Sequence, residues 1–207
     1  MAYDLADFES IYQAVESEVD NGETTDETKI KQLVNRVYRQ CIRKILEINR
    51  DYFLTNATKA TVASTKTYDF VDDWSIIDCM KPVALMDNGG TPLNRGSLRY
   101  DLRDYFWVGN GGVGFNPTPT SAQNYILWYI QRQSDLSATS DTPAFENTYW
   151  DGLVFGACYY YFIWKKSKKE AAYYKEDFAE WWKSFVSYIA STIDSREHIH
   201  IEDDGLD

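Results

Sequence analysis

The stretch 141–188 constrains the fold most, because it holds nearly half of the chain's phenylalanine, tyrosine and tryptophan residues. Its apolar residues recur every three or four positions, which is the spacing of one helix face. The pattern breaks once, at the lysine-rich sequence KKSKK, and then resumes. We therefore predict two antiparallel helices joined by a tight basic turn, with the aromatic side chains forming the core between them.

Local signals define the ends of the first of these helices. Thr142 is a favourable N-cap, and Pro143 suits a first helical position, where no intrahelical N–H bond is lost. Gly152 and Gly156 would allow another backbone to approach closely. Positive charge suits the exposed carbonyl groups at a helix C-terminus, and the residues expected to mark this end are Lys165, Lys166, Lys168 and Lys169.

Two amphipathic helices are predicted near the N-terminus. The first covers residues 5–19. Thr24 stands three residues before Glu27, which is the spacing of a capping box, and the second helix should run from there to about Asp51. Its outer side carries seven of the chain's 21 lysine and arginine residues. This side is either a solvated face or a contact with acidic neighbours, which copies of the chain could supply; the residues assigned to such a subunit contact are Arg36, Arg39, Arg43 and Lys44.

From about residue 60 the apolar pattern takes the period of strands. Residues 61–63 and 67–70 are rich in β-branched side chains and predict a hairpin. Residues 74–86 predict a second extended pair, with Pro82 at an edge or bulge. Residues 97–106 fit either a short helix or a strand. Residues 123–131 (QNYILWYIQ) form the clearest strand, and it should be covered on both faces, because both alternating sets are apolar.

The sequence GNGGVGFNPTPT, residues 109–120, predicts a loop, because glycine and proline disfavour regular structure there. Loops of this length in compact domains are usually functional or disordered. The segment either protrudes and contacts a partner or is a flexible connector. The residues assigned to that contact are Gly109, Gly111, Gly112, Val113 and Phe115.

The C-terminal sequence DSREHIHIEDDGLD contains both histidines. Its isoleucines alternate with polar residues, a strand pattern that is too short and too charged to fold alone. It is either a flexible tail or a segment that orders on a partner's sheet edge or groove. Metal binding by the His-x-His pair is a weaker third interpretation, because no cysteine accompanies it. The candidate docking residues are Glu197, His198, Ile199, His200, Ile201 and Glu202.

Strands grouped between helices predict an α+β fold. We expect an antiparallel helical bundle of four main helices with a central β-rich antiparallel insertion. The expected divisions are helices one and two in 1–58, the insertion with its glycine loop in 59–140, helices three and four in 141–193, and a flexible tail in 194–207.

Composition narrows the function. A net charge of −11 argues against a protein that grips nucleic acid with lysine and arginine, although a like-charged wall would let DNA slide past. No apolar run is long enough to span a bilayer, and the acidic N-terminus lacks the features of a signal peptide. Three scattered cysteines without metal-type spacing predict reduced core thiols, as in a cytoplasm.

No catalytic constellation emerges from the sequence. Gly109, Gly111 and Gly114 match G-x-G-x-x-G, but Pro117 follows where a phosphate-binding helix would have to begin. Both histidines lie in the tail, which is poorly preorganised for a catalytic triad. We therefore expect no enzyme, no cofactor and no metal site.

Four segments share their order and spacing with a known family. They are 141–146 continuing through 149–157, KQLVNRVYRQ at 31–40, the Tyr68-Asp69-Phe70 sequence followed by Asp73, and the Pro92-Leu93 step. Across about residues 11–188, the chain resembles the head-to-tail connector (adaptor) proteins of tailed bacteriophages. The glycine-rich residues 109–117 depart from the family pattern.

The resemblance implies a structural virion protein that is assembled in the host cytoplasm. Family members form a ring, usually twelvefold, beneath the portal, where the ring extends the channel for double-stranded DNA and offers a platform to the tail or a second connector. The C-terminal segment often docks on the portal, and the β-rich part faces neighbouring subunits or the tail. The resemblance therefore implies a tail-facing loop at Gly109, Gly111, Gly112, Val113 and Phe115. Another tail-completion or ejection-channel ring protein, or an unrelated intracellular binding module, is the alternative.

Overall fold

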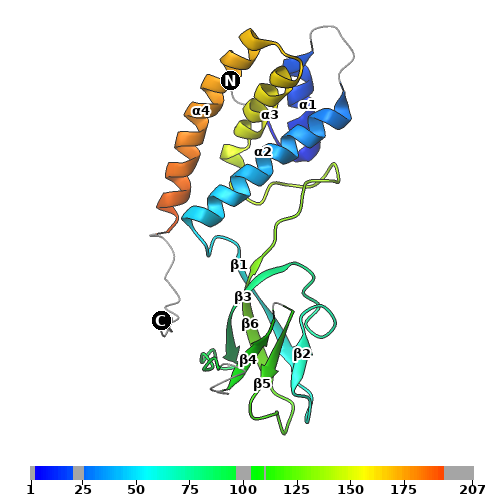
Figure 1. Cartoon of the computed structure of the whole chain (residues 1–207), viewed down its shortest axis with the longest axis vertical. Helices are drawn as coiled ribbons and strands as arrows, with labels where there is room; N and C mark the ends of the chain where they lie inside the picture. Colours follow the sequence, from blue (N-terminus) through cyan, green and yellow to red (C-terminus); the bar gives the residue numbers. More distant parts are fainter. Residues whose placement is uncertain (1–2, 21–25, 97–103, 110, 194–207) are drawn as a thin grey trace. The chain divides into compact units, whose positions relative to one another are not determined.

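The computed structural model describes residues 3–20, 26–96, 104–109 and 111–193 (Figure 1). Within these residues the chain forms two compact units. One comprises the described parts of Met1–Asn49 and Gln133–Glu197, and the other comprises those of Arg50–Arg132. The α-helices belong to the first unit and the strands to the second, which confirms the predicted α+β class.

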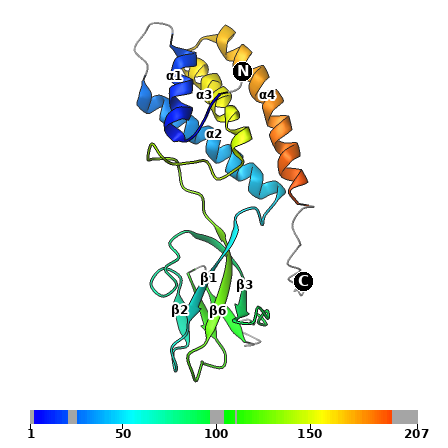
Figure 2. The same ribbon diagram turned by 180° about the vertical axis from the view of Figure 1, so that it is seen from behind.

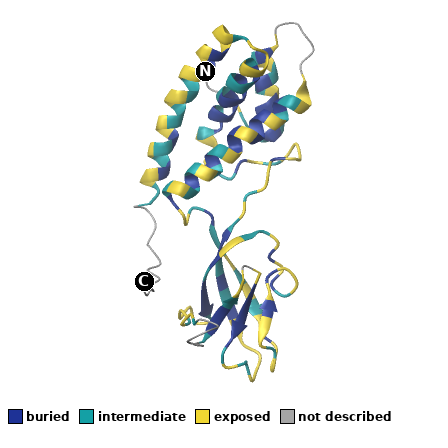
Figure 3. Ribbon diagram, viewed as in Figure 1, coloured by how far each residue is buried: buried dark blue, intermediate teal, exposed yellow. Residues whose placement is uncertain are grey.

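The helical unit contains α1 (Phe8–Val19), α2 (Glu27–Ile48), the short 3-10 helix η1 (Asn147–Tyr149), α3 (Asp151–Trp164) and α4 (Lys168–Ser191). In both views α3 lies among the other three helices (Figures 1 and 2). The inner sides of α1, α2 and α3 are buried, whereas most of α4 is exposed or half-buried (Figure 3). The stripes predicted for α1, α2 and most of α3 therefore face a common core. The expectation that the aromatic side chains of 141–188 all belong to this core is wrong, because Trp164 is 45% exposed and Trp181 and Trp182 are only half-buried.

Aspartates cap the first two helices. Asp7 and Ser10 form a capping box in which each side chain accepts from the other residue's backbone N–H, at 2.9 and 3.0 Å. Asp26 accepts from the Lys29 N–H at 2.9 Å at the start of α2. The prediction that Thr24 caps this helix is wrong, because the N-cap is Asp26, a residue type that is preferred over threonine at this position. Thr24 itself lies outside the described residues.

The predicted start of the third helix at Thr142-Pro143 is also wrong. α3 begins at Asp151 and follows η1. The indole N–H of Trp150 donates to the Phe145 carbonyl at 2.9 Å, and both side chains are buried. The Ala144 N–H also donates to the Tyr38 hydroxyl of α2 at 3.3 Å, and the Phe145 ring lies 5.2 Å from that of Phe185 on α4. These tertiary contacts hold the segment in a non-helical path and override a local capping signal that is weak by comparison.

Gly152 and Gly156 accommodate side chains rather than a neighbouring backbone. A Cβ atom at Gly152 would lie 1.9 Å from Cε2 of Trp181 on α4, and one at Gly156 would lie 2.8 Å from Cγ2 of Val37 on α2. The expectation of a close backbone approach is therefore wrong. The missing Cβ atoms create space on α3 that bulky residues of α2 and α4 fill.

The basic turn between α3 and α4 is shorter than predicted. Trp164 ends α3, and the chain reverses through Lys166, which has a left-handed φ of 61°. Lys168 and Lys169 lie in the first turn of α4. Their predicted role at the C-terminus of α3 is therefore wrong.

The β unit contains two three-stranded antiparallel sheets. The first has the order β1-β6-β3, and the second has the order β2-β5-β4. Side chains of both sheets share one core, in which the rings of Phe115 and Tyr125 lie 4.7 Å apart. The strands are β1 (Leu54–Ala60), β2 (Thr67–Asp69), β3 (Cys79–Asp87), β4 (Tyr105–Val108), β5 (Gly112–Phe115) and β6 (Asn124–Gln131).

The clearest predicted strand is confirmed as β6, the central strand of its sheet. Leu127 is fully buried, whereas Ile126 and Trp128 on the other face are half-buried. Pro82 lies on the edge strand β3 beside a register shift, as predicted. This position suits proline, which has no N–H to donate to a neighbouring strand.

The predicted pairings within the insertion are wrong. The expected hairpin of 61–63 with 67–70 does not form, because β1 pairs with β6 and β2 pairs with β5. Residues 74–86 contribute one bulged strand rather than a pair. Of the ambiguous residues 97–106, those at 97–103 lie outside the described residues, and Tyr105 begins strand β4.

Candidate interaction surfaces

The four basic residues assigned to a subunit contact occupy different environments on α2. The Arg39 guanidinium lies 3.6 Å from the Asp135 carboxylate, and the Lys44 ammonium lies 3.0 Å from Glu47. Arg43 is exposed and forms no ion pair with any described residue. Two of the four charges are therefore partly balanced within the chain.

Arg36 covers an aromatic ring. Its guanidinium carbon lies 3.9 Å from the centroid of the Tyr160 ring on α3, a cation–π geometry. The Tyr160 hydroxyl also accepts from the Gln40 side chain at 3.0 Å. Arg36 is exposed, but its contact with the Tyr160 ring restricts the orientation of its side chain. Less conformational entropy is therefore lost when Arg36 binds a partner.

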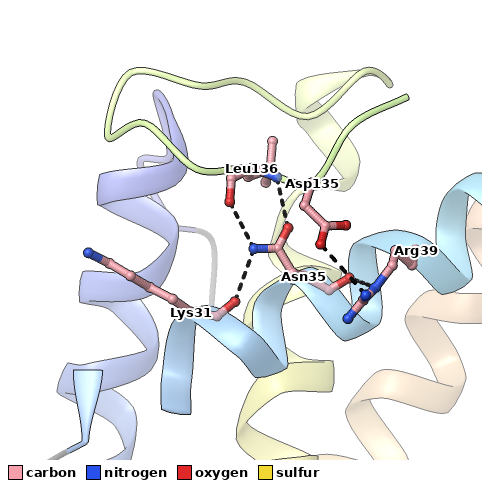
Figure 4. A network of polar contacts seen from close by, with 5 residues as sticks. All are labelled: Lys31, Asn35, Arg39, Asp135 and Leu136. Carbon is pink, nitrogen blue, oxygen red and sulfur yellow. Dashed lines mark hydrogen bonds and ion pairs between the residues drawn. The ribbon is translucent and has the colours of Figure 1, made fainter. Parts of the chain in front are cut away.

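Asn35 anchors the segment that returns from the β unit to the helices (Figure 4). Its amide accepts from the Leu136 N–H and donates to the Leu136 carbonyl, both at 2.8 Å, and also donates to the Lys31 carbonyl at 3.2 Å. Asn35 and Leu136 are both buried. This amide satisfies backbone groups that would otherwise be buried without partners, which is costly.

The glycine-rich segment is not a loop throughout. Gly112–Phe115 is strand β5, which pairs with β2 on one side and β4 on the other. Val113 and Phe115 are buried in the core of the β unit, and Gly112 is buried too. The loop prediction is therefore wrong for these residues, and only Gly109 and Gly111 of the proposed tail-facing set are exposed.

The candidate docking tail, from Glu197 to Glu202, lies outside the described residues. Its assignment stays a prediction.

One carboxylate joins three parts of the helical unit. Glu18 of α1 accepts hydrogen bonds from the hydroxyls of Tyr3, at 2.8 Å, and Tyr174 of α4, at 2.6 Å. Burial, reinforced by these bonds to Glu18, raises the pKa of both tyrosines. Both hydroxyls therefore stay protonated and keep donating over the physiological pH range.

The three cysteines are free thiols. Cys41 and Cys158 are buried, as predicted, and burial raises the pKa of each; burial also raises the pKa of the half-buried Cys79 to about 11. The thiolate is the form that attacks or binds metal, and little of it exists at neutral pH here. The described residues contain no group of three or more His, Cys, Asp or Glu side chains that could hold a metal ion.

None of the helices in the described part of the chain is both long and apolar enough to cross a bilayer.

Comparison with known families identifies the class of protein. The family model described as SU10 adaptor protein, a phage adaptor family, matches residues 6–198. The chain belongs to this family, which confirms the resemblance to head-to-tail connectors. No curated protein matches it.

Membership assigns the chain to the structural proteins of bacteriophages rather than to a known enzyme family. An adaptor of this kind is a component of the virion and interacts with other head and tail proteins. An unrelated intracellular binding module is therefore not supported.

Two contacts were not predicted from the sequence: the hydrogen bonds of Asn35 to the Leu136 backbone and the stacking of Arg36 on Tyr160. A signal was present for Asn35, since a polar residue stands among the buried Val34, Val37 and Tyr38 of α2, and such a residue requires buried partners. Nothing in the sequence indicated that Arg36 would find Tyr160, because their pairing depends on how α2 and α3 pack.

Proposed function

We propose that the chain forms a ring, with twelve copies, beneath the phage portal, where it extends the DNA channel and joins head to tail. The observation that carries this proposal is the family match over residues 6–198. The match spans both units, so it favours the architectural role of a whole adaptor over the reuse of one domain.

Electrostatics supports the passage of DNA. The chain has a net charge of −11, and a channel wall of like charge repels phosphate and prevents adhesion. Strong binding to duplex DNA would instead require many lysine and arginine contacts to phosphates. The duplex would move through the ring without sequence-specific recognition.

Three surfaces would make the contacts. Neighbouring copies would meet along α2, through residues that include Arg36 and Arg43. The C-terminal segment around Ile199 and Ile201 would dock on the portal by adding to a sheet edge or groove. The exposed turn at Gly109 and Gly111 would face the tail or a second connector.

Reconstitution tests the proposal. The purified chain is mixed with the portal protein of the same phage, and the products are analysed by size-exclusion chromatography and negative-stain electron microscopy. The expected result is a portal particle that gains a second ring with a central opening wide enough for duplex DNA. Absence of binding at micromolar concentration overturns it, and recovery of tail proteins without portal in pull-downs from infected cells would favour a tail-completion protein instead.

Deletion of residues 195–207 tests the docking tail separately. Because α4 ends at Ser191, the truncated chain should keep its circular dichroism spectrum and melting temperature. It should bind the portal more weakly. Equal assembly of the truncated and full-length chains would refute the role of the tail but not the ring.

A further inference from the structure

A ring of more than two identical subunits needs two different complementary surfaces on each copy, because every contact is head-to-tail. We infer that the helical unit carries both surfaces. One is a cationic–aromatic surface on α2 and α3, and the other is an acidic stripe on α1 that docks on the cationic–aromatic surface of a second copy. This inference rests on the ring proposed above and specifies how its subunits join.

The cationic–aromatic surface consists of Lys29, Arg36 and Arg43 of α2 with Tyr160, Ile163 and Trp164 of α3. The three cations are spaced by seven residues, so they follow one another along one side of α2, about 10.5 Å apart at 1.5 Å rise per residue. Two of them lie over α3 rings: Arg36 over Tyr160 at 3.9 Å, and Lys29 over Trp164 at 5.7 Å.

The acidic side chains around this surface are engaged by other cations. Glu27 pairs with Lys31 at 2.5 Å, Glu47 with Lys44, and Asp135 with Arg39. Lys29, Arg36 and Arg43 form no ion pair within the described residues, which leaves an excess of positive charge on an acidic chain. A partner that covers this surface should therefore be acidic.

Exposed apolar area favours a protein partner over DNA. Ile163 is 49% exposed and Trp164 is 45% exposed. Burying such side chains against another protein removes apolar surface from water, which is favourable. Phosphate groups offer charge but no apolar surface to cover an isoleucine, and phosphates dominate the contacts that duplex DNA makes with proteins.

The acidic stripe consists of Glu9, Gln13, Glu16 and Asp20. At about 100° per residue, these four positions fall within an arc of about 60° on α1 and its C-cap, away from the buried side. They are exposed or half-buried. Glu9 and Glu16 are seven residues apart, so their spacing along the helix matches that of the α2 cations, and the two rows can pair in register.

The two surfaces lie on different sides of the helical unit. Lys31 of α2 reaches α1, where its ammonium lies 4.2 Å from the Tyr12 ring centroid. Arg36 follows five residues later, which is about 140° around the axis of α2. One copy can therefore offer its acidic stripe to one neighbour and its cationic–aromatic surface to the other, as a ring requires.

Charge reversal tests the pairing in the full-length chain on the portal of the same phage. Two double variants are made, R36E/R43E and E9K/E16K, and K168E/K169E is a matched control on exposed lysines of α4. Each of the first two should raise the concentration needed for half-maximal ring formation at least tenfold, whereas the control should stay within threefold of wild type. Circular dichroism and melting temperature verify folding, and R36Q/R43Q and E9Q/E16Q replace any variant that fails this check.

Mixing the two variants gives the sharper result. In a 1:1 mixture, the reversed α2 row of one variant meets the reversed α1 stripe of the other, and the two unreversed rows also meet. The mixture should therefore form alternating rings, with an even number of copies, at concentrations where neither variant assembles alone.

Normal ring formation by either folded variant alone overturns this inference, and so does a mixture of folded reversed variants that fails to assemble. Both results leave the proposed ring intact, because the wild-type chain still forms it. Failure of the wild-type chain to form a ring on the portal instead refutes the proposed function.

Discussion

Substitution of Gly152 by alanine tests the packing of α3 against α4. A Cβ atom at this position would lie 1.9, 2.1 and 2.3 Å from three carbons of the Trp181 indole. The indole cannot move freely, because it is stacked between Phe178 and Phe185 at ring distances of 5.7 and 4.9 Å and interplanar angles of 12° and 13°. The added methyl group must therefore break this stack or push the helices apart.

The size of the effect follows from opposing contributions. Overpacking costs about 1–3 kcal/mol, and a weakened aromatic pair costs about 0.5–1.5 kcal/mol more. Replacement of glycine by alanine inside a helix returns about 1 kcal/mol. The free energy of unfolding should therefore fall by about 0.5–3.5 kcal/mol.

A double-mutant cycle with Trp181→Ala isolates the clash. Trp181→Ala alone should cost about 3 kcal/mol, at the lower end of the range for this substitution, because Trp181 is only half-buried. In that background the space beside Gly152 is open, so Gly152→Ala should become stabilising by up to about 1 kcal/mol. Guanidinium unfolding followed by far-ultraviolet circular dichroism measures all four chains, because this signal reports on the helical unit.

The sign change is the decisive observation. If Gly152→Ala were neutral or stabilising in the wild-type background, or had the same effect in both backgrounds, the packing of Trp181 into this position would be refuted. Ser187→Ala on the exposed side of α4 is the control, and it should change stability by no more than about 0.5 kcal/mol.

Three further predictions concern other parts of the chain. Asn35→Ala should destabilise the helical unit by about 2–4 kcal/mol in guanidinium unfolding, because it leaves the buried Leu136 N–H and carbonyl without their partner. Phe115→Ala should lower the stability of the β unit by about 3–5 kcal/mol in thermal unfolding, whereas Gly111→Ala, which has open space around it, should change it by less than about 0.5 kcal/mol. Hydrogen bonds from two backbone N–H groups, those of Ser137 and Ala138, lower the pKa of the Asp141 carboxyl from 3.8. A carboxyl group whose pKa is lower in the folded than in the unfolded state stabilises the folded protein at pH values above the unfolded pKa. The difference in the free energy of unfolding between wild type and Asp141→Asn should therefore be complete above about pH 5 and should disappear as the pH falls below 3.8 and through the folded pKa.

Each prediction has an outcome that contradicts it. A loss below about 1 kcal/mol in Asn35→Ala would mean that water replaces the amide at Leu136. Equal effects of Phe115→Ala and Gly111→Ala would restore the loop interpretation of this segment. A stability difference between wild type and Asp141→Asn that does not vary with pH would show that charge at Asp141 contributes nothing.

The positions that local periodicity identifies were predictable from the sequence. Phe8, Ile11, Tyr12, Val15 and Val19 of α1 are all buried, as their spacing predicts. The same reasoning located the apolar side of α2 and strand β6. A helix or strand face must be buried somewhere if it is apolar, and this requirement does not depend on which partner covers it.

The candidate surfaces were only partly predictable. The sequence indicated a basic side of α2, but it could not distinguish Arg39 and Lys44, which find acidic partners within the chain, from Arg36 and Arg43. It also could not indicate that Tyr160 lies beneath Arg36. These differences depend on distances between residues that are remote in the sequence.

Strand β5 shows most clearly what the tertiary structure decided. Its glycines predicted a loop, yet a Cβ atom at Gly112 would lie 2.6 Å from the Tyr68 carbonyl oxygen, and one at Gly114 would lie 2.3 Å from the Phe106 ring. Glycine is required there because β2 and the Phe106 side chain approach too closely for any side chain. By itself, the sequence determined which segments had to bury a face; the close approach of distant segments decided which strands paired and where glycine was needed.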